Sequence, residues 1–403
     1  MIKIAGGVCA SKGFTANGIH CGIRKNKTKR DLALIYSEVP ANAAAVYTQN
    51  LVKGAPLTVT KNNISDGKAQ AVICNSGNAN TCNANGIEIA EKMCELLGEK
   101  LRISPKDVVV ASTGVIGQPL DITPIANGID PLVAGLGDNS TYACEGIMTT
   151  DLKKKEIAFE FEINGVKCHI GGIAKGSGMI HPNMATMLVF VTTDCKISSE
   201  MLSKAVSEDV KTSFNMVSVD GDTSTNDMVS VLANGLAGNE EITSEGAEFN
   251  AFCEALHAVT SYLCRMIAAD GEGATKLLEC IAEGAVDDKN ARIAAKSVIC
   301  SSLFKAAMFG ADANWGRVLC AIGYSGADVD VNKVDVTFKS SKGEITVCRN
   351  GAGVEFSEEK AKEILLENEI QIVLGLGDGQ GRAVAWGCDL SYDYVKINGD
   401  YRT

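Results

Sequence analysis

The chain has 403 residues, of which 46% are hydrophobic, 22% are charged and only 7 are proline. A chain of this length can bury roughly three quarters of its unfolded surface, and this composition is typical of a globular protein rather than a disordered or collagen-like one. The 38 Lys and Arg against 49 Asp and Glu give a net charge of -11, and basic residues gather only at residues 153–155 and 24–30. This balance disfavours binding to nucleic acid.

No apolar run approaches the ~18 residues that suggest a membrane-spanning helix, since the longest covers residues 187–191. Residues 1–9 lack the apolar core of a secretory signal. The 15 cysteines form no Cys-x-x-Cys pair, which favours free, mostly buried thiols over zinc sites or disulfides. We therefore expect a cytoplasmic protein that has no contact with a membrane.

In the first half of the chain, residues 70–74 and 107–111 are short Val- and Ile-rich segments that predict strands. Between them, apolar side chains recur at helical spacing, at Ala90, Met93, Cys94, Leu97 and Leu101. The order strand, helix, strand follows from this pattern.

In the second half, apolar spacing predicts a long amphipathic helix over residues 249–266 and a more buried helix over residues 291–309. Residues 334–338 alternate, residues 340–343 form a turn, and residues 344–348 continue as the partner strand of a hairpin. No repeat or linker marks a domain boundary. Strands and helices are mixed throughout, so the fold class is α/β or layered α+β, with mixed sheets flanked by helices.

The common nucleotide and calcium motifs are incomplete. The run at 375–381 lacks the glycine at position 380 that G-x-G-x-x-G requires. Residues 271–276 lack the glycine before the lysine of a P-loop, and residues 220–227 lack two required residues of an EF-hand. Both segments are interpreted as ordinary turns.

The four histidines are too dispersed in the sequence to predict a metal site or a histidine-based triad. We therefore expect neither a metal nor a nucleotide cofactor.

The most unusual stretch covers residues 175–191, where a Gly-rich, Pro-containing loop leads into an apolar strand. At its edge, the hydroxyl of Thr186 follows the small residue Ala185, which is the arrangement that self-cleavage needs. The hydroxyl attacks the Ala185 carbonyl, the peptide becomes an ester, and water releases a chain that begins with Thr186. Its free α-amine, with a pKa near ~8, can then assist proton removal from the hydroxyl. An ordinary strand threonine is the alternative.

That stretch and several others, in the same order, resemble the ornithine acetyltransferase family of arginine biosynthesis, also called bifunctional glutamate N-acetyltransferase. The other stretches are NSGNAN at 75–80, ASTGVIG at 111–117, IMTTD at 147–151, DGDTSTND at 220–227, DGEGATK at 270–276, ANWGR at 313–317, AWGCDL at 385–390, and YVKIN and YRT within 394–403. Together they cover almost the whole chain.

The resemblance implies a self-processed N-terminal-threonine nucleophile enzyme. Cleavage between Ala185 and Thr186 would give an α chain, 1–185, and a β chain, 186–403, which stay associated as a heterotetramer of two α and two β chains. Thr186 would be the nucleophile.

The resemblance also implies an oxyanion hole at Thr113 and Gly114, formed by a hydroxyl and a backbone N–H. Without the resemblance, these two residues read as a plain turn after the strand at 107–111.

The resemblance further implies substrate-binding positions at Thr149, Lys175, Thr186, Glu272, Asn398 and Thr403. Thr149 is preferred to its neighbour Thr150. Lys175 would pair with the substrate carboxylate and Glu272 with a distal ammonium, while a solvated surface charge is the alternative for both. Asn398 and Thr403 lie near the end of the chain, so their roles require the tail to dock over the site.

The implied reaction moves an acetyl group from N2-acetylornithine to glutamate through an acetyl-Thr186 intermediate. Members of the family can also use acetyl-CoA as the donor. One alternative is an amidase or aminopeptidase with the same self-processed threonine. The other is a non-catalytic metabolite-binding protein whose chain stays uncut.

Overall fold

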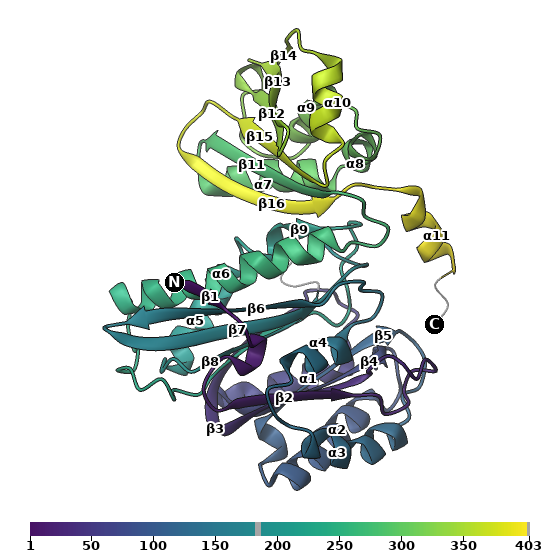
Figure 1. The fold of residues 1–403 in the computed structure, drawn as a ribbon, viewed down its shortest axis with the longest axis vertical. Coiled ribbons are helices and arrows are strands. Elements are labelled where there is room, and N and C mark those ends of the chain that lie inside the picture. Colours follow the sequence, from purple (N-terminus) through teal and green to yellow (C-terminus); the bar gives the residue numbers. More distant parts are fainter. Residues whose placement is uncertain (182–186, 401–403) are drawn as a thin grey trace.

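The computed structural model describes residues 1–181 and 187–400, and its strands form two mixed sheets (Figure 1). The larger sheet has the order β1-β6-β7-β8-β10-β3-β4-β5, with β2 paired to β3. Its strands are β1 (Ile2–Ile4), β2 (Phe14–Ile19), β3 (Leu32–Tyr47), β4 (Lys68–Asn78), β5 (Val108–Val115), β6 (Lys155–Ile163), β7 (Val166–Lys175), β8 (Leu188–Thr193) and β10 (Met228–Ala233). The mixed α/β class predicted from the sequence is confirmed.

The smaller sheet has the order β14-β13-β12-β15-β11-β16-β9. Its strands are β9 (Val217–Ser218), β11 (Leu277–Ala285), β12 (Asp335–Ser340), β13 (Gly343–Arg349), β14 (Ala352–Gly353), β15 (Glu369–Gly375) and β16 (Gly381–Cys388). The predicted hairpin is confirmed as β12 and β13, which pair antiparallel across the turn between Ser340 and Gly343.

Helices cover both sheets, and α6 runs along the larger sheet on the side that faces the smaller one (Figure 1). The helices are α1 (Ala55–Asn63), α2 (Gly86–Leu101), α3 (Thr123–Ala134), α4 (Ser140–Ile147), α5 (Ser199–Asp209), α6 (Ala247–Ala269), α7 (Asp288–Cys300), α8 (Ser302–Phe309), α9 (Trp315–Gly323), α10 (Glu358–Leu365) and α11 (Tyr392–Asp400). None of those formed by the described residues is both long and apolar enough to cross a membrane.

Strand β8 lies in the middle of the larger sheet and is apolar along most of its length because both of its faces are buried. Leu188 and Phe190 pack into the core on one side, while Val189 and Val191 belong to the core on the other. Strands buried on both faces read as continuous hydrophobic runs rather than alternating ones. This explains the apolar run at the end of the stretch that drew attention in the sequence.

The predicted strand, helix and strand in the first half are confirmed as β4, α2 and β5, with β4 and β5 parallel. The second predicted strand begins at Val108 rather than Asp107, because Asp107 closes a short 3-10 turn. The long amphipathic helix is confirmed as α6, and the 15 cysteines are free thiols.

The single helix predicted over residues 291–309 is wrong, because this segment forms α7 and α8. At Ser301, between them, the backbone is extended, with φ -70° and ψ 110°. The Ser301 side chain accepts a hydrogen bond from the Phe304 N–H and so caps α8. Serine favours such caps over helix interiors, and apolar spacing alone does not reveal the break.

Candidate active site

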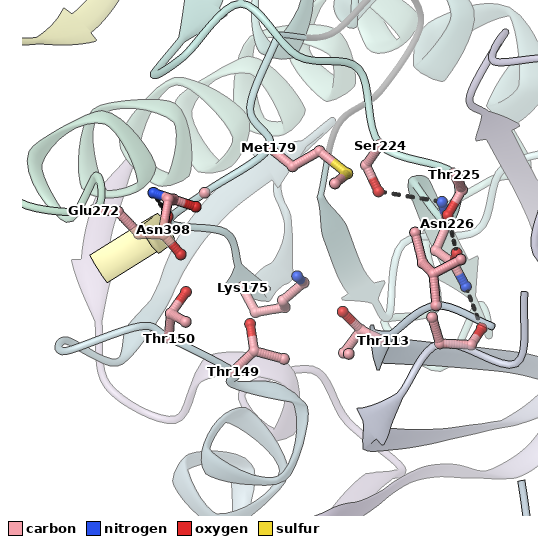
Figure 2. A pocket seen from close by; sticks show the side chains of 14 residues that line it. Thr113, Thr149, Thr150, Lys175, Met179, Ser224, Thr225, Asn226, Glu272 and Asn398 are labelled. Carbon is pink, nitrogen blue, oxygen red and sulfur yellow. Dashed lines mark hydrogen bonds between the residues drawn. The ribbon is translucent and has the colours of Figure 1, made fainter. Parts of the chain in front are cut away.

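Six of the residues predicted from the sequence line one pocket (Figure 2). They are Thr113, Gly114, Thr149, Lys175, Glu272 and Asn398. Five separate segments supply them: the end of β5, the loop after α4, the last residue of β7, the turn between α6 and β11, and helix α11. The family resemblance therefore identified six residues, on segments that are distant in the sequence, which the fold brings together in one pocket.

Thr186, Ala185 and Thr403 lie outside the described residues, but the described residues before Thr186 reach the pocket and those after it pair with a strand that ends there. Met179 lines the pocket. On the other side, Leu188 pairs with Lys175, because β7 and β8 run antiparallel in adjacent positions of the larger sheet. The chain thus leaves the pocket wall before residue 182 and re-enters the sheet beside a pocket lysine after residue 186.

Gly114 allows β5 to approach β4 closely where the two strands end. Its φ of +134° lies in the region that favours glycine, and a Cβ atom there would collide with the backbone of Gly77. Beside it, Thr113 is buried, and its hydroxyl forms no hydrogen bond with any other described residue. That hydroxyl is therefore available to donate to a ligand in the pocket, as an oxyanion hole requires.

The pocket carries one positive and one negative side chain. The Lys175 ammonium forms no hydrogen bond or ion pair with another described residue. Glu272 is 8% exposed, and its Oε2 accepts a hydrogen bond of 2.9 Å from Asn398 Nδ2. The alternative of a solvated surface charge is thus wrong for Glu272.

Asn398 of helix α11 lines the pocket, so the tail docks beside it as far as this residue (Figure 2). Ser391 Oγ donates to the Gly273 carbonyl, and the rings of Phe309 and Tyr392 meet edge to face at 5.6 Å between centroids. The first contact holds the residue before α11 against the turn that carries Glu272, and the second holds the first residue of α11 against the end of α8.

A fully buried ion cluster lies behind the pocket. Lys155 Nζ donates to Asp151 Oδ1 at 2.7 Å and to Asp270 Oδ2 at 2.5 Å, and all three side chains are at most 2% exposed. Burial by itself would raise the pKa of Asp151, but the ammonium groups of Lys155 and Lys175 outweigh burial and lower it to about 2. Asp151 is therefore ionised at neutral pH.

The same two aspartates hold the backbone of the pocket wall, Asp151 through its carboxylate and Asp270 through its backbone carbonyl. Asp151 accepts hydrogen bonds from the N–H groups of Thr149, at 2.9 Å, and Gly176, at 2.7 Å. The Asp270 carbonyl accepts from Ser177 Oγ at 2.6 Å, and the Ser177 carbonyl accepts from the Glu272 N–H at 3.0 Å. Three predicted substrate positions, at Thr149, Lys175 and Glu272, are thereby fixed relative to one another.

Residues 220–227 form a bent loop between β9 and β10, in agreement with the predicted turn, and Ser224, Thr225 and Asn226 within it line the pocket. Asn226 Nδ2 donates to the carbonyls of Ala79 and Ser112, at 2.6 and 3.0 Å. It thus joins the segment before β10 to the ends of β4 and β5. The available signal was the resemblance of this segment to the family, which carried no role for any single residue in it.

Thr150 also lines the pocket, so the structure places both threonines of the Thr149 and Thr150 pair there. Met179 likewise lines the pocket and was not predicted. The sequence offers no reason to place Met179 in the pocket, because its side chain carries no charged or hydrogen-bonding group typical of a binding residue.

Next to Asn226, Asp227 is buried, and no hydrogen bond reaches its Oδ2. Burial raises the pKa of Asp227 well above its ordinary value, although hydrogen bonds from Ser224 and Thr48 and the charge of Lys175 act in the opposite direction.

The pocket brings together a hydroxyl donor, one lysine and one glutamate. A mixed α/β fold with such a pocket is suited to an enzyme that acts on a small charged molecule.

The ArgJ family model matches residues 15–403. Relatives named arginine biosynthesis bifunctional protein ArgJ include that of Caldanaerobacter subterraneus subsp. tengcongensis, 51% identical over 394 residues and 97% of each chain. The one from Bacillus subtilis is 47% identical over 408 residues, covering 100% of this chain and 98% of its own.

A crystal structure of arginine biosynthesis bifunctional protein argJ from Bacillus halodurans is 46% identical, with a TM-score of 0.50. The match covers 53% of this chain and 98% of that chain. This chain belongs to the ArgJ family.

Replacing Lys155 with Met should lower the free energy of unfolding at neutral pH by about 3–5 kcal/mol, because Asp151 and Asp270 would remain buried without a counter-charge. Denaturant unfolding measures the change. The matched control is Lys154→Met, since Lys154 is 48% exposed and pairs with Glu145 at the surface. That variant should lose less than about 1 kcal/mol.

The acid dependence of the same two proteins separates an ion pair from simple packing. The lowered pKa of Asp151 stabilises the wild type above pH ~4, and this contribution is lost as the pH falls from about 4 to about 2. In Lys155→Met, burial should raise the pKa of Asp151, so acidification should remove part of the penalty. Equal acid sensitivity of variant and wild type in this range would contradict the assignment.

Proposed function

We propose that this enzyme transfers the acetyl group of N2-acetylornithine to glutamate through an acetyl-Thr186 intermediate, as a step of arginine biosynthesis. The observation that carries the proposal is the convergence of Thr113, Gly114, Lys175 and Glu272 on one pocket, which Met179 also lines and whose Lys175 pairs with Leu188 of β8. Membership of the ArgJ family supports the same reaction.

The charges of the pocket match those of the donor. N2-acetylornithine carries an α-carboxylate, which Lys175 would bind, and a distal ammonium, which Glu272 would bind. Asn398 donates to Glu272 Oε2 and so fixes the direction of the carboxylate. Glutamate has no distal ammonium, so Glu272 should discriminate between the two substrates.

In the first half-reaction, the Thr186 oxygen attacks the acetyl carbonyl and its proton passes to the α-amine of the same residue. The Thr113 hydroxyl and the Gly114 N–H would stabilise the developing oxyanion. The amide C–N bond then breaks, the departing amine takes the proton, and ornithine leaves.

In the second half-reaction, the glutamate amine attacks the acetyl ester and releases the Thr186 hydroxyl. One amide is broken and a like amide is made, so the exchange is close to thermoneutral and requires no nucleotide.

We also propose that cleavage before Thr186 gives an α chain, 1–185, and a β chain, 186–403, in the cytoplasm. Nearly the whole crystallised chain from Bacillus halodurans, 98% of it, matches only 53% of this chain, which supports a product of two chains.

The order of strands in the larger sheet supports continued association of the α and β chains. Strands β8 and β10 would belong to the β chain, yet they lie between β7 and β3 of the α chain. Separation would therefore break a ladder on each side. A heterotetramer of two such pairs completes the proposal.

Thr186→Ala should leave the precursor uncut and inactive, because no hydroxyl remains to attack Ala185. A denaturing gel and fragment mass spectrometry measure the outcome. Thr186→Ser is the matched control, since it keeps a hydroxyl and should still be cleaved. A cut at any bond other than the one between Ala185 and Thr186 would refute the assignment of the nucleophile.

Thr113→Ala should lower kcat by roughly two orders of magnitude and change KM much less, because one donor to the developing oxyanion is lost. Processed enzyme must first be separated from any uncut precursor, since the same donor can serve the cleavage step. Thr113→Ser, which retains the hydroxyl, is the control. An unaltered kcat in fully processed Thr113→Ala would remove this residue from the site.

Glu272→Gln should raise KM for N2-acetylornithine more than KM for glutamate, because only the first substrate has a distal ammonium. Steady-state kinetics with each substrate varied in turn measure the difference. A double-displacement mechanism also predicts parallel double-reciprocal lines and an acetylated β chain when glutamate is withheld. Intersecting lines without an acetylated β chain would point to direct transfer in a ternary complex.

A further inference from the structure

Three polar side chains of helices α5 and α6 form a chain of hydrogen bonds, and none of them lines the pocket described above. His257 Nδ1 lies 2.8 Å from Asp209 Oδ1, and His257 Nε2 lies 3.0 Å from Ser261 Oγ. The order serine, histidine, aspartate and the use of the two ring nitrogens are those of nucleophilic serine enzymes. We call Asp209, His257 and Ser261 the helix triad.

The packing of two helices brings the helix triad together. His257 and Ser261 are separated by one turn of α6, so their side chains share one face of that helix. Asp209 is the last residue of α5, which packs against α6, and it lies 48 residues before His257. Spacing in the sequence therefore predicts no histidine-based triad, and the tertiary structure supplies one.

Asp209 is held so that it orients the imidazole ring. Its side chain is 6% exposed, and its second oxygen, Oδ2, accepts a hydrogen bond of 2.9 Å from Ser213 Oγ. Because a carboxylate only accepts hydrogen bonds, Nδ1 of His257 carries the proton that it shares with Asp209. In the neutral ring, Nε2 is then an acceptor, and the hydroxyl of Ser261 donates to it.

The helix triad is open to solvent. The His257 side chain is 46% exposed, and Ser261 is half-buried beside it. A reagent dissolved in water can therefore reach the Ser261 oxygen. Cys253, one turn before His257, does not compete as a nucleophile, because burial raises the pKa of its thiol to about 11.

Asp209 is the charged group that governs His257. Its hydrogen bond and its negative charge raise the pKa of His257, although burial acts in the opposite direction. On α6, the exposed Glu254 lies one turn before His257. Other neighbouring charged side chains are in ion pairs: Lys204 with Glu245, Lys211 with Glu208, and Arg265 with Glu279 and Glu369.

We propose that Ser261 is a second nucleophile of this protein, which takes the acyl group of activated esters such as aryl esters. The Ser261 oxygen attacks the ester carbonyl, and its proton passes to His257 Nε2. The bond between the carbonyl carbon and the aryl oxygen then breaks, and the phenol leaves with that proton. Attack by water through the same base releases the carboxylic acid and restores the hydroxyl.

The position of Ser261 restricts the reaction to esters with good leaving groups. Ser261 lies inside a helix of 23 residues, whose backbone N–H groups are engaged in the helix itself. The described residues therefore give it no backbone donor comparable with the one at Gly114 to stabilise an oxyanion. General base catalysis remains, which is typically worth about 10² to 10⁴ in rate. A purely structural hydrogen-bond chain between α5 and α6 is the alternative.

The test is incubation of the purified protein with p-nitrophenyl acetate, followed by mass spectrometry of its peptides. We expect Ser261 to gain an acetyl group roughly a hundredfold faster than Ser203, an exposed serine of α5 with no histidine partner among the described residues. The difference should disappear in His257→Gln, which lacks the base. The rate should rise with pH through a midpoint above the ordinary histidine pKa of about 6.5, because the neutral ring is the base and Asp209 raises the pKa of His257.

Asp209→Asn tests Asp209 as a positioning residue. The amide can donate to Nδ1, so the proton of the neutral ring moves to Nε2, which then cannot accept from Ser261. We expect acetylation to slow at least about tenfold, and the midpoint of the pH profile to fall because the negative charge is gone. The matched control is Glu208→Gln, which removes an exposed carboxylate at the next position and should change neither value.

Three outcomes overturn the inference. Acetylation of Ser261 that is no faster than that of Ser203 would show that the hydroxyl is not activated. Acetylation that is unchanged in His257→Gln would remove the histidine as the base. In the Thr186→Ala background, release of p-nitrophenol that persists in Ser261→Ala but is lost in His257→Gln would assign the reactivity to the imidazole alone. That background also separates this inference from the proposed function, because Ser261 should react equally well without the proposed nucleophile Thr186.

Discussion

The buried ammonium of Lys155, held between the carboxylates of Asp151 and Asp270, is the interaction on which the pocket depends. The Asp151 carboxylate serves the ion cluster and also fixes backbone of the pocket wall at Thr149 and Gly176. The Asp270 carboxylate serves the cluster and fixes the adjoining backbone at Leu152 and Lys153. Removing charges from water costs several kcal/mol per ion, which is offset only when every partner is in place. The pocket wall is therefore tied to a cluster that tolerates little rearrangement, which suits a site that must hold a reacting group in one geometry.

The order of strands connects the fold with the proposed cleavage. The connection that contains residues 182–186 joins two adjacent strands, β7 and β8, of one sheet. A cut in this connection would remove none of the hydrogen bonds between these strands. The core draws on residues from both sides of the cut and would stay packed. Self-processing is thus compatible with a stable sheet.

The charges of the pocket suit a ligand that carries both signs. Among the described residues that line it, one lysine, Lys175, and one glutamate, Glu272, are charged. The same wall contains Gly114, next to the Thr113 hydroxyl, so the two charges and the hydroxyl donor face one space. This arrangement is compatible with a zwitterionic amino-acid derivative.

Periodicity in the sequence determined the elements with strong local signals, such as α2, α6 and the β12 and β13 hairpin. Resemblance identified Thr113, Gly114, Thr149, Lys175, Glu272 and Asn398, which the structure gathers in one pocket. The break at Ser301 escaped prediction because apolar spacing continues across it. The roles of Lys155 and Asn226 were decided only by tertiary structure. Their partners Asp270 and Ala79 lie far away in the sequence, and no local pattern records which distant group will compensate a buried charge or an amide.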